Sequence, residues 1–225
     1  NYIQRDSEIK FDRDLVRQMG SLGFLGADLP EKLGGMGLGT LASGMIGEAL
    51  AHGDFNYAAY VCSTVSVLGR ILANSASPEL SQYWVPRIIS GESIIGLALT
   101  EPSGGSDAGN LRTKAVRKGD RYFLSGEKTS ISMAHQADGF IVFARTGTQE
   151  SRAHGITAFF VRGDSKGLSR TRFNDVGSKV VGRGSLFLDE VEVPVENTIA
   201  DEGAGFKQVM AGFDFNRAAI GLECC

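Results

Sequence analysis

The sequence predicts an α+β protein with an all-helical N-terminal domain, a middle antiparallel β-barrel or sandwich, and the first helix of a further helical bundle. Apolar residues recur at helical spacing up to about residue 92. From Ile94 the pattern changes to short apolar runs separated by turns, and helical spacing returns after Pro194. We therefore expect domains at residues 1–92, 93–200 and 201–225.

The composition is that of a globular protein. The 225 residues are 42% hydrophobic and 22% charged, and the formal net charge is −3. Because Lys and Arg are interspersed among acids, no basic patch indicates a nucleic-acid partner. Apolar runs are too short for a membrane span, and the three cysteines form neither a disulfide framework nor a metal spacing. These features favour a soluble, cytoplasmic protein with reduced thiols, and the absence of an initial Met favours a chain cut at both ends.

Capping and breaking residues delimit the expected helices. Thr40 is a plausible N-cap for a helix that Gly53 would close. Ser77 would cap a later helix that has Pro at its first position, and Gly91 would end it. The expected helices cover residues 11–19, 41–52, 57–72, 78–90 and a segment from about residue 205 onward.

The middle segment predicts closely spaced strands joined by hairpin turns such as Lys118-Gly119-Asp120. This spacing favours antiparallel pairing over a Rossmann sheet, and no Gly-x-Gly-x-x-Gly opens a βαβ unit. The expected strands are 94–99, 114–117, 122–125, 140–145, 157–161, 168–173 and 185–193.

The stretch Leu99 to Asp107 is the most informative in the chain. The apolar run 94–99 ends in a turn that contains Pro102, two glycines, two serines and Asp107. Gly104 and Gly105 permit positive φ and close approach of a bulky partner, and Ser103 and Ser106 add hydroxyls. The turn has the composition of a phosphate-binding nest, although such turns are more often plain turns.

Four ordered motifs carry a family resemblance. Thr100-Glu101-Pro102 before Gly105-Ser106-Asp107 resembles the segment of the acyl-CoA dehydrogenase family that contacts FAD. Similar family motifs are found at 126–132, at 189–197, and at Gly203-x-Gly205-Phe206 followed by 213–217. The resemblance implies the family's order of domains, and it implies FAD rather than NAD as cofactor.

The resemblance also implies a set of site residues. Ser132 would donate a hydrogen bond to flavin N5, Ser106 would meet the FAD pyrophosphate and lie near the acyl-CoA, and Arg217 would meet the CoA nucleotide. At Ser130 many members carry Trp, so flavin stacking would differ here. The implied FAD contacts are Leu97, Ala98, Leu99, Thr100, Gly105, Ser106, Ser130, Ile131 and Ser132. The implied acyl-CoA contacts are Ser106, Phe213, Asp214 and Arg217.

Simpler interpretations exist for the same residues. Without the family, Ser130 and Ser132 would be strand positions that face water, and Asp214 with Arg217 an exposed helical pair. Glu127-Lys128 indicates a solvated face. No metal set is expected, and Cys62 indicates a small core residue.

The function implied by the resemblance is α,β-dehydrogenation of an acyl-CoA, with a carboxylate to take the α-proton while FAD accepts the β-hydride. Members supply that carboxylate from the C-terminal domain, so no catalytic base is named, and we expect no turnover from these 225 residues alone. The resemblance also implies electron-transfer flavoprotein as acceptor and a homotetramer, cytoplasmic in a bacterium or in the mitochondrial matrix of a eukaryote. We expect the apolar side of the final helix to pack on partner helices outside this sequence. A flavin-dependent oxidase or monooxygenase, and a non-catalytic flavin- or CoA-binding module, are the alternatives.

Overall fold

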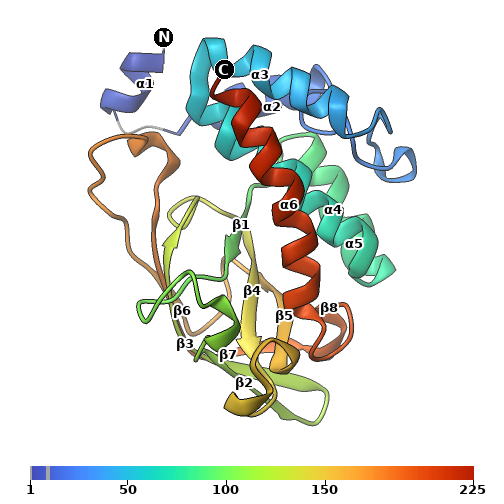
Figure 1. Cartoon of the computed structure of the whole chain (residues 1–225), viewed down its shortest axis with the longest axis vertical. Coiled ribbons are helices and arrows are strands. Elements are labelled where there is room, and N and C mark those ends of the chain that lie inside the picture. The colour runs from blue at the N-terminus through green and yellow to red at the C-terminus, as the bar shows by residue number, and fades with distance from the viewer. Residues whose placement is uncertain (1, 9–10) are drawn as a thin grey trace.

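The computed structural model describes residues 2–8 and 11–225. Within these ranges the side chains outside the description are those of Asp6, Glu8, Tyr60, Val61, Ser63, Gln208, Val209, Ala211, Gly212, Asp214 and Phe215. Figure 1 shows the N-terminal helices gathered at one end and the strands at the other, with the last helix running between the two ends. The α+β class is therefore confirmed, and the three domain boundaries stay a prediction.

The helical part contains five α-helices and a π-helical turn. They are α1 (Tyr2–Glu8), α2 (Arg13–Ser21), α3 (Thr40–Tyr57), the π-helix η2 (Ala58–Ser63), α4 (Thr64–Ser75) and α5 (Pro78–Ile89). The chain ends with α6 (Gly205–Glu223). Short 3-10 helices are η1 (Glu31–Leu33), η3 (Ala108–Asn110), η4 (Gln149–Gly155), η5 (Lys179–Val181) and η6 (Val195–Asn197). No helix in the described ranges is long and apolar enough to cross a bilayer.

Helix boundaries confirm one predicted cap and correct another. Ser77 Oγ accepts from the Leu80 amide at the start of α5, as expected. Thr40 is the first helical residue rather than the cap, because Gly39 holds the cap position with φ +81°. The helix also continues past Gly53: Asp54 adopts non-helical angles, and α3 is kinked there instead of ending.

One eight-stranded sheet forms the other part of the protein, with the order β6-β7-β3-β2-β4-β5-β8 and β1 paired to β4. Its strands are β1 (Ile95–Ala98), β2 (Lys114–Lys118), β3 (Arg121–Ile131), β4 (Gly139–Arg145), β5 (Ile156–Arg162), β6 (Leu168–Arg170), β7 (Gly184–Pro194) and β8 (Thr198–Ile199). Most pairs are antiparallel, as predicted, whereas β1 runs parallel to β4.

The strand lengths differ from the prediction in three places. β3 extends through Gly126 to Ile131, because its long pairing with β7 tolerates two register irregularities. β6 stops at Arg170, and the short β8 was not predicted. The extension of β3 matters most, because it carries Ser130 and Ile131 away from the hairpin and toward the helices.

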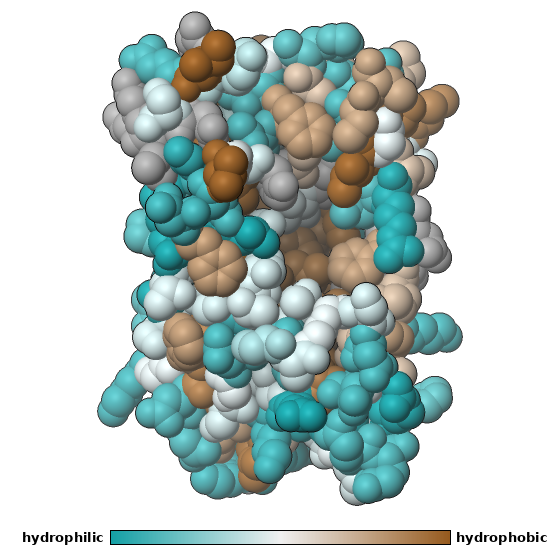
Figure 2. Space-filling model, turned by 60° about the vertical axis from the view of Figure 1, so that its left-hand side comes forward, coloured by the Kyte–Doolittle hydropathy of each residue, from teal (hydrophilic) through white to brown (hydrophobic). Residues whose placement is uncertain are grey.

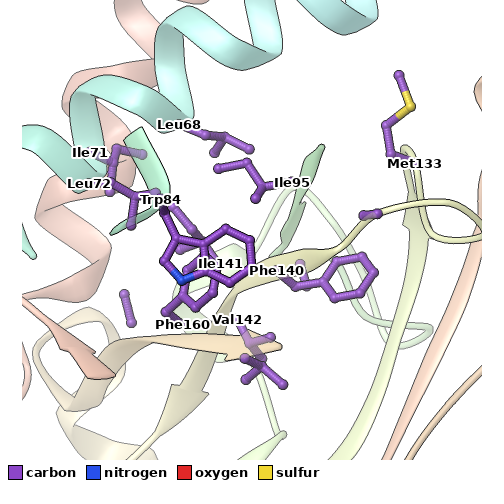
Figure 3. Close-up of a cluster of buried hydrophobic side chains, with 14 of the residues drawn as sticks. Leu68, Ile71, Leu72, Trp84, Ile95, Met133, Phe140, Ile141, Val142 and Phe160 are labelled. Atoms are coloured by element: carbon purple, nitrogen blue, oxygen red, sulfur yellow. The ribbon is translucent and has the colours of Figure 1, made fainter. Parts of the chain in front are cut away.

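The core joins the helices to the sheet. Figure 3 shows Leu68, Ile71 and Leu72 of α4 above the side chains of the sheet, with Trp84 against Phe160. The ring centroids of Trp84 and Phe160 are 4.5 Å apart. Phe160 is fully buried and Trp84 is 7% exposed, so this contact fixes α5 on β5.

Candidate functional site

A pocket of about 510 Å³ lies between the helices and the end of the sheet. In Figure 2 the surface is hollowed at mid-height, and brown apolar residues floor the hollow. The size is typical of a small-molecule site, for which apolar walls with a few convergent polar groups are the rule. The lining residues are Phe55, Ala59, Thr64, Leu97, Leu99, Thr100, Gly105, Ser106, Ala108, Ser130, Ile131, Ser132, Phe206, Met210, Phe213, Asn216, Arg217 and Ile220.

The pocket brings together ten of the twelve residues that the family motifs single out. They come from β1 and the turn after it, from the end of β3, and from α6, which are far apart in the sequence. Of the other two, Ala98 is fully buried and does not line the pocket, and the side chain of Asp214 lies outside the described residues. Residues of three of the four motifs thus meet at one pocket, whereas the motif at 189–197 contributes none of the lining residues.

The end of β1 forms one wall. Successive side chains of a strand point to opposite faces, so Leu97 and Leu99 reach the pocket while Ala98 points into the core. Thr100 follows the strand and places its hydroxyl at the same wall. In the turn beyond it only Gly104 adopts a positive φ, at +152°, whereas both glycines were expected to do so.

The end of β3 forms a second wall through an irregularity. The register with β7 shifts between Lys128 and Ile131, and Ser130 sits in the left-handed region with φ +57°. This bulge turns three consecutive residues, Ser130, Ile131 and Ser132, toward the pocket. The interpretation of Ser130 and Ser132 as a plain alternating strand is therefore wrong.

α6 forms the third wall. Phe206, Met210 and Phe213 are half-buried, line the pocket and pack against the core of this chain. The prediction that this helix turns its apolar side to partners outside the sequence is thus corrected for these three residues. Ile220, at 39% exposed, also lines the pocket.

Eight lining residues are not among the predicted site residues: Phe55, Ala59, Thr64, Ala108, Phe206, Met210, Asn216 and Ile220. Phe55, Ala59 and Thr64 lie in an apolar helical stretch whose pattern indicates core, and Asn216 looks like an ordinary polar helix position. Asn216 Oδ1 is buried and has no hydrogen-bond partner among the residues that the structure describes. An unpaired buried acceptor is costly, so this atom marks a place where a ligand donor would fit.

The polar groups of the pocket are available to a ligand. Among the described residues, the hydroxyls of Thr100, Ser106, Ser130 and Ser132 have no hydrogen-bond partner in the protein. Arg217 is the one charged residue among the described lining residues, and it is exposed and forms no ion pair with them. An apolar floor ringed by free hydroxyls, with a cation at the rim, fits a ligand that joins a planar apolar ring to anionic phosphates.

Lys128 corrects a further prediction. Its side chain is fully buried rather than solvated, and Nζ lies 2.8 Å from Glu101 Oε1. Burial lowers the pKa of Lys128 to about 8, against the opposing attraction of Glu101. For Glu101 burial favours a raised pKa, but Lys128 and the neighbouring amide donors outweigh it and leave the pKa lowered. The 2.8 Å separation of Nζ and Oε1 is that of a hydrogen-bonded ion pair.

Two family models match the chain. Residues 2–92 match the N-terminal domain of acyl-CoA dehydrogenase, and residues 96–191 match its middle domain. The chain is 35% identical to isobutyryl-CoA dehydrogenase of Dictyostelium discoideum over 217 residues, which are 96% of this chain and 52% of that protein.

Two further relatives share this architecture. The CarC subunit of the caffeyl-CoA reductase-Etf complex of Acetobacterium woodii is 32% identical over 95% of this chain and 56% of its own length. Butyryl-CoA dehydrogenase from Megasphaera elsdenii superposes with a TM-score of 0.91 at 30% identity, over 98% of this chain and 58% of that structure. The chain spans about half the length of the curated relatives it matches. It belongs to the acyl-CoA dehydrogenase family and carries the N-terminal and middle domains of that family.

Proposed function

We propose that the pocket binds FAD and an acyl-CoA, and that the whole protein catalyses α,β-dehydrogenation of the thioester. The observation that carries this proposal is the convergence of ten motif residues on one pocket with unpaired polar groups. FAD, when bound, would accept the hydride that leaves Cβ, which carries both electrons of the oxidation.

Each wall has a distinct part in this proposal. The end of β1, from Leu97 to Thr100, lines the pocket and would offer its amides and one hydroxyl to the ring system. Ser106 lies in the turn that would meet the pyrophosphate, where hydroxyl and amide donors favour an anion. Ser132 offers a donor toward the ring position that receives hydride, since added negative charge there is stabilised by a hydrogen bond.

The acyl-CoA would lie against α6. Arg217 can pair with a phosphate of the CoA nucleotide, and Phe213 adds apolar contact. None of the described lining residues is a carboxylate, so the group that takes the α-proton is proposed to come from sequence outside these 225 residues. We accordingly expect no turnover from this segment by itself.

The partners follow from the same proposal. Electron-transfer flavoprotein is the proposed acceptor of the electrons, supported by the similarity to a subunit of an Etf complex. A homotetramer is the proposed assembly, from the family resemblance alone.

The test uses the full-length protein and its absorbance on titration with FAD and, separately, NAD. FAD should bind and NAD should not, and NAD binding with no flavin affinity would overturn the cofactor assignment. Arg217→Gln should weaken acyl-CoA binding about tenfold, since a hydrogen-bonded charge contact is worth roughly 1.5–3 kcal/mol. Arg17→Gln, on the exposed surface of α2, is the matched control and should bind normally.

An oxidase is the second candidate, favoured by one observation. Ser130 is exposed and lines the pocket where many family members carry a bulky Trp, so the site is less shielded from dissolved oxygen. Oxygen consumption by the full-length protein during acyl-CoA turnover separates the two: rapid consumption supports the oxidase, and dependence on an added electron acceptor supports the dehydrogenase.

A further inference from the structure

The ion pair between Lys128 and Glu101 lies directly behind the pocket. Lys128 on β3 is fully buried, and Glu101, three residues past the end of β1, is 5% exposed. By contrast, the ion pair of Lys118 with Glu190 is largely exposed. Burying two charges is costly unless further hydrogen bonds compensate. The groups that make these hydrogen bonds with Lys128 and Glu101 are therefore the groups that the pair holds in place.

Glu101 ties together the two ends of the pocket loop, which we define as residues 101–113. Its Oε2 accepts from the Arg112 amide at 2.6 Å, and its Oε1 accepts from the Thr113 amide at 2.9 Å. The loop between these points carries Gly105 and Ser106 to the pocket. A single carboxylate therefore closes the base of a loop whose residues 102–107 are exposed.

Lys128 extends the same connection to the end of β1. Nζ donates to the carbonyl of Leu99 at 3.1 Å as well as to Glu101. The next residue, Thr129, donates its amide to the carbonyl of Thr100 at 2.9 Å. The pair thus joins the end of β1, the pocket loop and β3 at one buried point.

Two apolar side chains could fill the space that Lys128 and Glu101 occupy, but they could not make the same hydrogen bonds. Two Met side chains of similar length leave no buried charge, and such replacements are often well tolerated for stability. They offer no acceptor to the amides of Arg112 and Thr113 and no donor to Leu99. Stability and loop position can therefore be separated by experiment.

We propose that Lys128 and Glu101 are positioning residues that hold the pocket loop and the end of β1 in the geometry that binds FAD. The inference rests on the proposed function, because FAD is the ligand whose contacts the two segments supply. Neither side chain lines the pocket, so both act through Leu99, Thr100 and the loop residues.

The central variant is the double substitution Lys128→Met with Glu101→Met in the full-length protein. We expect it to remain folded with a lower denaturant midpoint, because the buried Thr113 amide loses its acceptor, and to bind FAD at least about tenfold more weakly, since several hydrogen bonds to charged groups that hold the site are lost. The visible circular dichroism of the flavin, measured at saturation, should also change, because the ring would sit in a less constrained site. Lys118→Met removes an exposed pair from the same sheet and should leave both readouts unchanged.

Hydrogen exchange without flavin supplies the second measurement. The amides of Arg112 and Thr113 should be protected in the wild type and exchange faster in Glu101→Gln, which lacks one carboxylate oxygen. Unprotected amides in the wild type would overturn the inference even if the double variant failed to fold. A folded double variant with wild-type FAD affinity and dichroism would overturn it as well. A wild-type protein that binds no FAD, with both amides protected, would instead contradict the proposed function.

Discussion

Replacing Ser132 by Ala tests whether its hydroxyl stabilises the reduced form of a bound flavin. The Ser132 hydroxyl is half-buried, lines the pocket and has no hydrogen-bond partner among the described residues. Its loss should change the free energy of unfolding of the flavin-free protein by less than about 0.5 kcal/mol. A hydrogen bond to a charged group is worth roughly 1.5–3 kcal/mol. If the hydroxyl stabilises the reduced ring, the two-electron potential should fall by roughly 30–65 mV, because 30 mV corresponds to about 1.4 kcal/mol.

The assay is a redox titration of the bound flavin in the full-length protein, with the rate of reduction by acyl-CoA measured alongside. Ser130→Ala is the matched control, because Ser130 lies in the same bulge and lines the same pocket. A potential and a rate that stay at the wild-type values in Ser132→Ala would refute the assigned role. Equal shifts in both variants would show a general effect of pocket polarity rather than a specific bond.

Three further outcomes are expected, two from the structure and one from the proposed assembly. Burial raises the pKa of Tyr57 to about 12. As pH rises, the phenol therefore loses its proton in the unfolded chain before it does so in the folded protein. The free energy of unfolding should fall by roughly 2–3 kcal/mol between pH 10 and pH 12. Urea denaturation at pH 9 and 11 should show about half of this loss in the wild type and a smaller one in Tyr57→Phe; equal losses would contradict it. Phe160→Ala should cost about 3–5 kcal/mol, since the side chain is fully buried against Trp84, whereas Phe187→Ala, at 38% exposed, should cost below about 1 kcal/mol. Sedimentation should find the full-length holoprotein as a homo-oligomer, and a monomer with stoichiometric FAD would contradict the proposed assembly.

Local rules predicted the elements well where the pattern is strong. Ser77 with Pro78 marks a helix start whose hydrogen bond is present in the structure, and the strand runs 114–117 and 140–145 match β2 and β4 to within one residue. The helix boundary at Gly53 was wrong, because the chain bends at Asp54 and continues as helix. The Asp54 carboxylate forms an ion pair with Arg5 of α1. The two residues are far apart in the sequence, so their spacing could not predict this contact.

The sequence by itself determined the class of fold, because periodicity and turn chemistry distinguish helices from strands, and its resemblance to the family singled out ten of the eighteen residues that line the pocket. Only the tertiary structure decided how those residues meet. It placed Ser130 and Ile131 at the end of β3, and Ser132 just after it, in one wall through a bulge, and it brought α6 onto this chain's own pocket. It also buried Lys128, which local charge patterning had put in water. Burying the charge of Lys128 requires an opposite charge beside it. That charge belongs to Glu101, which lies 27 positions away in the sequence.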